Sequence, residues 1–117
     1  MDKPKKIIRT TLGEYLMDRE AYDGSGVYVL ACFPSLGCLY IGQSKHTHNR
    51  VRAHFQEYPS KQDLAMCTFI NLVMLDALNF RLDILIPPMP NCNQWLYDVE
   101  RELIQRQQPL FNTQYTR

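Results

Sequence analysis

The sequence has little net charge, no long apolar run and no internal repeat or low-complexity stretch. Its formal net charge is +1 at pH 7 over 117 residues, of which 45% are hydrophobic and 21% are charged. These values are ordinary for a globular chain, and the length fits one domain. The most apolar stretch, residues 68–77, is interrupted by Asn71 and Asp76 and is far too short to span a bilayer. We therefore expect a single globular domain with no membrane partner.

The four cysteines include no C-x-x-C pair. The N-terminus carries lysines rather than a long apolar segment, so we expect no secretory signal and a cytoplasmic protein. Cysteines in such a chain are expected to be reduced thiols rather than a disulfide framework. A zinc site built from Cys38, His46 and His48 is an alternative, although their spacing matches no usual ligand pattern.

The charges are unevenly distributed along the chain. Residues 1–9 hold four basic side chains, and we expect them to form a basic N-terminal arm that is partly flexible, followed by one folded domain over residues 10–117. Residues 43–56 contain Lys45, Arg50 and Arg52 and no acid. Such a strip is compatible with phosphate binding, and it is equally what a solvated helix face looks like.

Hydrophobic periodicity and turn residues predict an alternation of helices and strands. We expect strands over residues 26–33, 38–42 and 80–86, and helices over residues 11–19, 47–57, 62–78 and 93–108. The first two strands are joined by turn residues and make a hairpin. One small sheet needs helices to cover its faces. The expected fold is therefore α+β, with a small three-stranded antiparallel sheet flanked by helices.

The predicted hairpin carries one tyrosine on each strand, Tyr28 and Tyr40. If Phe33 pairs with Leu39, both phenols emerge on the same face of the sheet. If Phe33 pairs with Cys38 instead, they emerge on opposite faces, because a shift of one residue reverses the side. The hairpin alone is also consistent with two ordinary strand tyrosines that contribute to packing.

Two further positions carry side chains suited to phosphate chemistry. Arg50 and His54 are four residues apart on a predicted helix and project from the same side, whereas Arg52 points elsewhere. Arginine offers forked donors to phosphate oxygens, and histidine titrates near neutrality. Each residue taken singly is as readily explained by a solvated helix face.

Glu100 lies at the margin of the apolar stripe of the last predicted helix, one turn from Leu96 and Ile104. A half-buried carboxylate requires a partner, which can be a cationic side chain or a bound metal ion. Mg²⁺ is typically held by one or two carboxylates together with waters and substrate phosphate oxygens. The helix pattern leaves a metal site and a Glu–Arg ion pair as equal alternatives.

These residues occur in an order that resembles the GIY-YIG nuclease family, including homing endonucleases and the N-terminal domain of the bacterial excision-repair nuclease. The matching positions are Gly26-Val27-Tyr28, Tyr40-Ile41-Gly42, Gln43-Ser44-Lys45, Arg50 with His54, and Glu100 with Leu103, Ile104, Pro109 and Asn112. The resemblance covers residues 26–112. Each motif is short, and it is their conjunction and spacing that make the resemblance specific. Val27 departs from the isoleucine of the first motif, and Gln43 stands where several relatives have lysine or serine.

The resemblance implies a GIY-YIG-like endonuclease that hydrolyses DNA phosphodiester bonds with Mg²⁺ or Mn²⁺. The implied catalytic residues are Tyr28, Tyr40, Arg50, His54 and Glu100. The implied substrate-binding residues are Gly42, Gln43, Lys45, Arg52 and Asn112, the last of which would also brace the site. In this scheme Glu100 holds the divalent ion, Arg50 clamps the phosphate and Tyr40 orients the water or the phosphate. Our own hypothesis is that Tyr28 and His54 together activate the attacking water.

The expected partner is DNA, whether duplex, branched or single-stranded. We expect limited sequence preference, or targeting supplied by a homodimer, by a partner protein or by the basic arm. One alternative is a catalytically silent nucleic-acid-binding module with the same fold. Another is a small structural or regulatory protein whose tyrosines and Glu100 are merely packed, which predicts no salt-dependent DNA binding.

Overall fold

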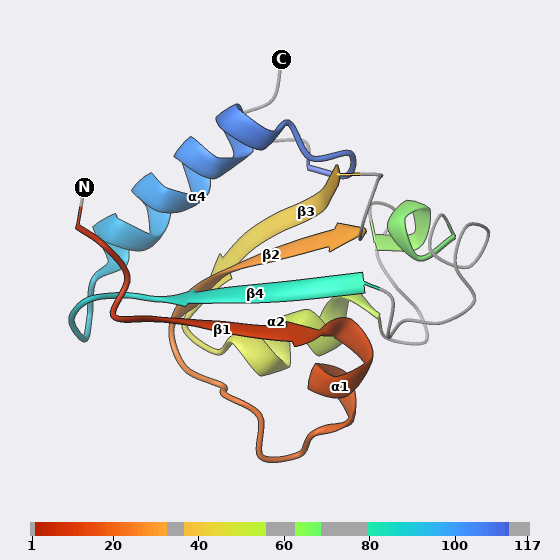
Figure 1. Ribbon diagram of the computed structural model, residues 1–117, viewed down its shortest axis with the longest axis horizontal. Helices are drawn as coiled ribbons and strands as arrows, with labels where there is room; N and C mark the ends of the chain where they lie inside the picture. Colours follow the sequence, from red (N-terminus) through yellow and green to blue (C-terminus); the bar gives the residue numbers. More distant parts are fainter. Residues whose placement is uncertain (1, 33–36, 56–62, 69–79, 113–117) are drawn as a thin grey trace.

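The structure is a computed structural model that describes residues 2–32, 37–55, 63–68 and 80–112. Their backbone forms a single antiparallel sheet with helices on both faces (Figure 1). The elements are β1 (Lys6–Thr11), α1 (Leu12–Met17), β2 (Gly26–Cys32), β3 (Gly37–Ser44), α2 (Thr47–His54), β4 (Phe80–Ile86) and α4 (Asn93–Gln107). Residues 63–68 are also helical. The α+β class is therefore confirmed.

The expectation of three strands is wrong, because the described sheet has four strands in the order β1-β4-β2-β3. The additional strand, β1, falls partly in the segment that was expected to be a basic arm, and it pairs antiparallel with β4 from Lys6↔Ile86 to Thr11↔Arg81. Its sequence KIIRTT is rich in β-branched residues, which favour strands. Charged side chains are common on edge strands, so the basic residues did not exclude a strand here.

The two faces of the sheet are covered by different helices, as Figure 1 shows. Successive residues of a strand point to opposite faces. Tyr28, Leu30, Tyr40 and Ile84 belong to a core cluster that also contains side chains from α1 and α2. Their sequence neighbours Val27 and Ile41 belong to a second cluster with α4. The tyrosine-bearing face is therefore the face covered by α1 and α2.

The helix expected over residues 62–78 is described only at residues 63–68, and the remainder of that prediction lies outside the described residues. Leu64, one of the apolar residues whose helical spacing predicted this helix, is 54% exposed. Met66, two residues later, is 1% exposed and belongs to the tyrosine-bearing core cluster. The inward face of this segment is consequently set by Met66.

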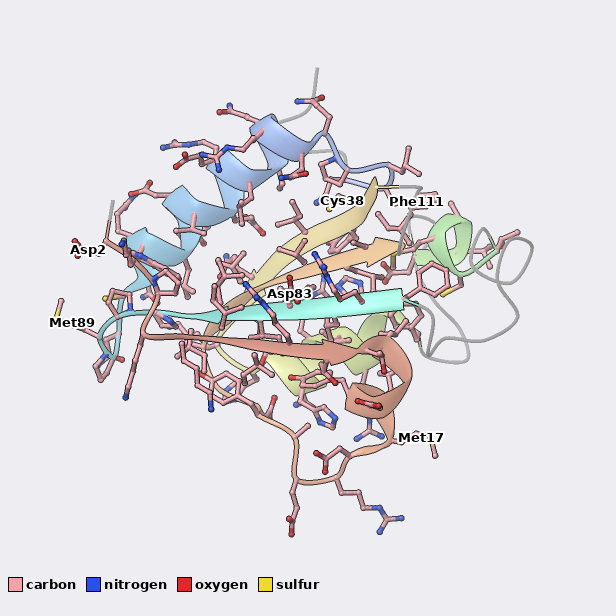
Figure 2. All side chains as sticks on the ribbon, viewed as in Figure 1. Asp2, Met17, Cys38, Asp83, Met89 and Phe111 are labelled. Carbon is pink, nitrogen blue, oxygen red and sulfur yellow. The ribbon has the colours of Figure 1, made fainter. Side chains whose placement is uncertain are left out.

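The free edge of β3 is covered by the chain that follows α4. The backbone N–H groups of Leu110 and Phe111 donate to the carbonyl oxygens of Cys38 and Leu39, at 3.2 and 2.9 Å. Figure 2 shows Cys38 and Phe111 close together at this end of the sheet. Unpaired strand edges are templates for unwanted pairing, and this short segment blocks part of one.

The described surface has a few exposed apolar side chains, and Figure 2 shows Met17 and Met89 pointing outward. Scattered apolar residues of this kind are normal on globular proteins. Among the described residues, no helix combines the length and apolar character needed to cross a bilayer.

Candidate active site

Tyr28 and Tyr40 lie on the same face of the hairpin, although the pairing is neither of the two registers considered from the sequence. Tyr28 pairs with Gly42 and Leu30 pairs with Tyr40, and a register shift follows between Leu30 and Ala31. The two rings are nearly parallel, at 24°, with centroids 6.2 Å apart. Both phenols therefore lie on one face of the sheet, as they would in the register that pairs Phe33 with Leu39.

Gly42 has a structural reason to be glycine. A Cβ atom at this position would clash with the hydroxyl oxygen of Tyr28, the residue paired with Gly42 across the hairpin. The bare backbone of Gly42 thus lets the Tyr28 ring lie flat across β3. This role is independent of any contact between Gly42 and a substrate.

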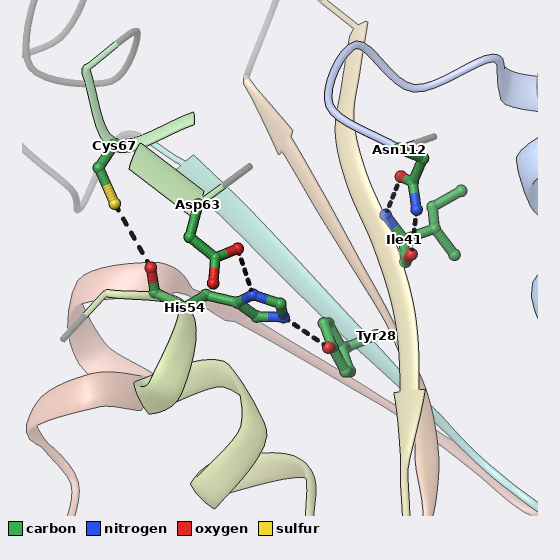
Figure 3. Close-up of polar contacts among 6 residues, drawn as sticks. All are labelled: Tyr28, Ile41, His54, Asp63, Cys67 and Asn112. Carbon is green, nitrogen blue, oxygen red and sulfur yellow. Dashed lines mark hydrogen bonds and ion pairs between the residues drawn. The ribbon is translucent and has the colours of Figure 1, made fainter. Parts of the chain in front are cut away.

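His54, at the end of α2, contacts both tyrosines. Its Nε2 atom lies 2.7 Å from the Tyr28 hydroxyl oxygen (Figure 3). Its ring centroid lies 4.7 Å from that of Tyr40. The His54 side chain is almost fully buried, with 2% of the residue exposed. Burial lowers the pKa of His54 below its ordinary value, Asp63 partly opposes this, and Arg50 adds to the decrease. At neutral pH the imidazole is therefore uncharged.

Asp63 is a site residue that sequence reasoning missed. Its Oδ1 atom lies 2.8 Å from Nδ1 of His54. Nothing in the spacing between His54 and Asp63 links them, because they lie on different helical segments. The available signal was Met66, since residues three apart share one face of a helix and Met66 points into the core.

Arg50 acts on both phenols from α2. Its charge and hydrogen bonding lower the pKa of Tyr28 and of Tyr40, which places the guanidinium beside the two hydroxyl groups. The expectation that Arg50 and His54 project from one side of the helix is confirmed by these shared neighbours. Arg52 instead lines a separate surface hollow. The structure thus brings Arg50, and not Arg52, to the tyrosines.

Glu100 faces the same centre from α4 and is only 6% exposed, so the helix spacing correctly predicted its burial. Burial raises its pKa to about 7, and a hydrogen bond from the Gln43 backbone limits the rise. Its negative charge also raises the pKa of both tyrosines, which places it near them. Within the described part of the chain, Glu100 forms none of the ion pairs. The alternative of a Glu–Arg pair is therefore not found there.

In this environment both tyrosines keep their hydroxyl protons at neutral pH. Burial is the main cause that raises the pKa of Tyr28 far above its ordinary value. Tyr40 raises it further, Arg50 opposes the rise, and Glu100 adds to it. Burial likewise raises the pKa of Tyr40. Two neutral phenols and a neutral imidazole thus lie together, with a guanidinium and a buried carboxyl group near enough to change the pKa of both phenols.

The chain is similar in structure to the GIY-YIG N-terminal endonuclease domain of UvrC from Thermotoga maritima. With the magnesium-bound form of that domain it shares 17% identity and a TM-score of 0.61, covering 87% of this chain and 96% of the domain. A tyrosine point mutant bound to the catalytic divalent cation gives the same TM-score at 16% identity, covering 88% of this chain and 96% of the domain. The chain has the GIY-YIG endonuclease fold. No protein-family model matches the sequence, and no curated protein matches it either.

Within this GIY-YIG fold, Asn112 lies against the edge of β3. Its side-chain oxygen accepts from the Ile41 N–H at 2.8 Å, and its amide nitrogen donates to the Ile41 carbonyl oxygen at 2.7 Å (Figure 3). Asn112 is buried, so this pair of bonds supports β3 beside Tyr40. Asn112 thus holds the backbone of β3 at Ile41, the residue next to Tyr40.

The other two positions expected to bind substrate lie at the end of β3 in this GIY-YIG fold. Lys45 is exposed just after β3. Gln43 is half-buried, and its backbone contacts Glu100. Lys45 is thus the more accessible of the two side chains.

The zinc alternative fails for the described residues, among which no three potential His, Cys, Asp or Glu ligands come together. His48 is instead a core residue of the GIY-YIG fold, with Nε2 at 2.9 Å from the carbonyl oxygen of Tyr15, to which it donates. Burial raises the pKa of the Cys38 thiol to about 11, which disfavours the thiolate that a metal requires.

The donor set fits a hard divalent ion that keeps most of its water ligands. The Glu100 carboxyl is buried, faces the tyrosines and has no cationic partner in the described part of the chain. Mg²⁺ is commonly bound through a single carboxylate with water and substrate phosphate completing its shell. Glu100 can therefore hold Mg²⁺ or Mn²⁺.

Proposed function

We propose that the chain is a metal-dependent endonuclease that hydrolyses phosphodiester bonds of DNA, with one catalytic domain that includes β1. The observation that carries the proposal is that His54 contacts the Tyr28 hydroxyl, while Arg50 and Glu100 lie near enough to change the pKa of Tyr28. The structural neighbours support it, because they are an endonuclease domain bound to a catalytic divalent cation. In this proposal Glu100 holds Mg²⁺ or Mn²⁺.

Tyr28 and His54 activate the attacking water together. A phenol with a raised pKa does not exist as phenolate at neutral pH, so Tyr28 cannot act as a free base. It can accept a proton from water only while its own hydroxyl proton passes to His54, 2.7 Å away. The water oxygen then bonds to phosphorus, and the bond from phosphorus to the 3′ oxygen breaks.

The remaining residues bind and orient the phosphate. Arg50 clamps a non-bridging oxygen, since its forked donors match phosphate geometry and its side chain is exposed beside the phenols. Tyr40 orients the water or the phosphate. A divalent ion held by Glu100 supplies positive charge that stabilises the transition state and the leaving oxygen.

The DNA backbone beyond the scissile phosphate is held by side chains and backbone near the end of β3 and on α2. Lys45 and Arg52 are exposed and contact neighbouring phosphates, and the strand backbone at Gly42 and Gln43 approaches the substrate. Asn112 acts through β3, by holding Ile41. Targeting comes from a second copy, a partner protein or the basic side chains of residues 1–9, some of which lie on β1.

The test is cleavage of supercoiled plasmid in Mg²⁺. Tyr28→Phe and Glu100→Gln should each slow nicking by about 100-fold or more, because general-base and metal contributions are of this order. Tyr97→Phe is the matched control, since Tyr97 is an exposed tyrosine on α4 and should cut like the parent. Parental rates in both site variants would rule out the mechanism.

The competing function is a silent nucleic-acid-binding module. It predicts binding to DNA without cleavage of linear, nicked, forked or single-stranded substrates over a full Mg²⁺ and Mn²⁺ titration. The presence of His54, Arg50 and Glu100 close to the two tyrosines argues for catalysis.

A further inference from the structure

His54 is hydrogen-bonded at both ring nitrogens inside the protein. Its Nε2 lies 2.7 Å from the Tyr28 hydroxyl, and its Nδ1 lies 2.8 Å from Oδ1 of Asp63 (Figure 3). All three residues are buried, with Tyr28 at 2%, His54 at 2% and Asp63 at 7% exposure. A neutral imidazole has one N–H donor and one acceptor nitrogen, so its two partners cannot play the same part.

The two partners of His54 differ in what they can do. A tyrosine hydroxyl can donate or accept, whereas a carboxylate can only accept. The carboxylate of Asp63 therefore requires the proton to be on Nδ1 of His54. This leaves Nε2 as the acceptor, and the Tyr28 hydroxyl must donate to it.

Asp63 is held in place by the short helical segment at residues 63–68. Met66 anchors the segment in the core cluster that includes Tyr28. The Cys67 thiol donates to the backbone carbonyl oxygen of His54 at 3.4 Å (Figure 3). This segment therefore forms hydrogen bonds with both the backbone and the side chain of His54. Together these bonds fix the orientation of the imidazole ring.

We propose that Asp63 is a positioning residue that fixes His54 in the Nδ1–H tautomer, so that Nε2 is ready to receive the proton of Tyr28. The proposal rests on the endonuclease function proposed above and adds a direction to its proton transfer. The Tyr28 proton moves to Nε2 as the water proton moves to the Tyr28 oxygen. The resulting imidazolium lies against the negative charge of Asp63, which stabilises it. Asp63 touches neither substrate nor metal in this scheme.

The first test measures the His54 tautomer directly by ¹⁵N NMR of histidine-labelled protein without DNA. The chain has three histidines, and the spectrum of His54→Gln assigns the signals of His54 by their loss. The expected result at pH 7.5 is a protonated Nδ1 and an unprotonated Nε2. A protonated Nε2 in the parent protein would overturn the proposal, whatever the nuclease activity.

The second test uses Asp63→Asn, which keeps the shape but not the charge, and whose amide can donate as well as accept. We expect the His54 signals to move toward the Nε2–H tautomer or a mixture. Single-turnover cleavage should fall by about 10- to 1,000-fold, while DNA affinity measured in Ca²⁺ stays within twofold of the parent. Asp98→Asn, on α4, is the matched control and should cut at the parental rate.

The outcomes separate this proposal from the proposed function. If the parent cuts and Asp63→Asn cuts equally fast, the assignment of Asp63 is wrong and the endonuclease function stands. If the parent cuts no substrate, the function is wrong, and the ¹⁵N spectra of parent and variant still decide whether Asp63 sets the tautomer. Should Asp63→Asn fail to fold, the parental spectrum alone decides between the two tautomers.

Discussion

At the scale of single residues, the burial of Glu100 is the clearest feature that lowers the stability of the fold. Burial raises its pKa from 4.5 to about 7, so between these pH values the folded chain holds a proton that the unfolded chain has released. Stability then falls as pH rises, because ionising Glu100 favours the unfolded state. The loss begins near pH 4.5 and is complete above pH 7.

We therefore predict that Glu100→Gln is more stable than the parent at pH 8 in a chelator. The difference should be about 1–3 kcal/mol and should vanish near pH 4.5. Urea unfolding across this pH range measures it. Glu20→Gln, an exposed control, should follow the parental profile. Parallel profiles for the parent and Glu100→Gln would show that Glu100 is not strained by burial.

At the scale of elements, the side chain of Asn112 continues the hydrogen bonding along the edge of β3 at Ile41. Asn112 satisfies both the N–H and the carbonyl of Ile41, as a neighbouring strand would. Removing its amide leaves two buried polar groups without partners, which costs about 1–3 kcal/mol for each group in full desolvation.

We predict that Asn112→Ala lowers the free energy of unfolding by about 2–4 kcal/mol. Asn112→Asp should lower the free energy of unfolding by a smaller amount, because a carboxylate still accepts from the Ile41 N–H but cannot donate to its carbonyl oxygen. Denaturant unfolding measures both. Asn49→Ala, exposed on α2, is the control and should change stability little. Equal stability of Asn112→Ala and the parent would contradict the bracing role.

Sequence patterns identified most elements because their periodicity was strong. The hairpin, the strand at residues 80–86 and the last helix were all predictable, and so was the burial of Glu100 within an apolar stripe. β1 was missed because its stability comes from pairing with β4, whose residues follow their partners by 70 to 80 positions, and because its charges suggested a solvated arm.

Tertiary pairing also decided the parts of the site that the sequence left open. The common face of Tyr28 and Tyr40 depends on a hairpin register that strand propensity does not fix. Asp63 meets His54 only because two separate helical segments pack together. Local spacing predicts which side of one helix a residue occupies, and it does not predict which other element that side will touch.

At the scale of the whole molecule, net charge says little about DNA, because the positive charge that matters is local. Arg50 and Lys45 are exposed near the site, and each phosphate contact releases a bound cation from DNA. We predict that affinity for a short duplex falls linearly with salt on logarithmic axes. Arg50→Ala and Lys45→Ala should each reduce that slope by about 1.

Fluorescence anisotropy of labelled DNA, recorded in a chelator at about 50–300 mM salt, measures these slopes. Arg101→Ala is the matched control, since Arg101 lies exposed on α4 and pairs with Asp98. A parental affinity that does not change with salt would favour the structural or regulatory alternative over both nucleic-acid functions.

The strand order β1-β4-β2-β3 has a consequence for how the chain folds. β2 and β3 are joined by a short connection and can pair early, at little loop-closure entropy. β1 has no partner until β4, from the other end of the sequence, has docked on β2. In pulse-labelling hydrogen exchange, amides of the hairpin should gain protection before that of Ile8. The half of the sheet that holds Tyr28 and Tyr40 would then assemble first, and the chain's first strand would be the last to join.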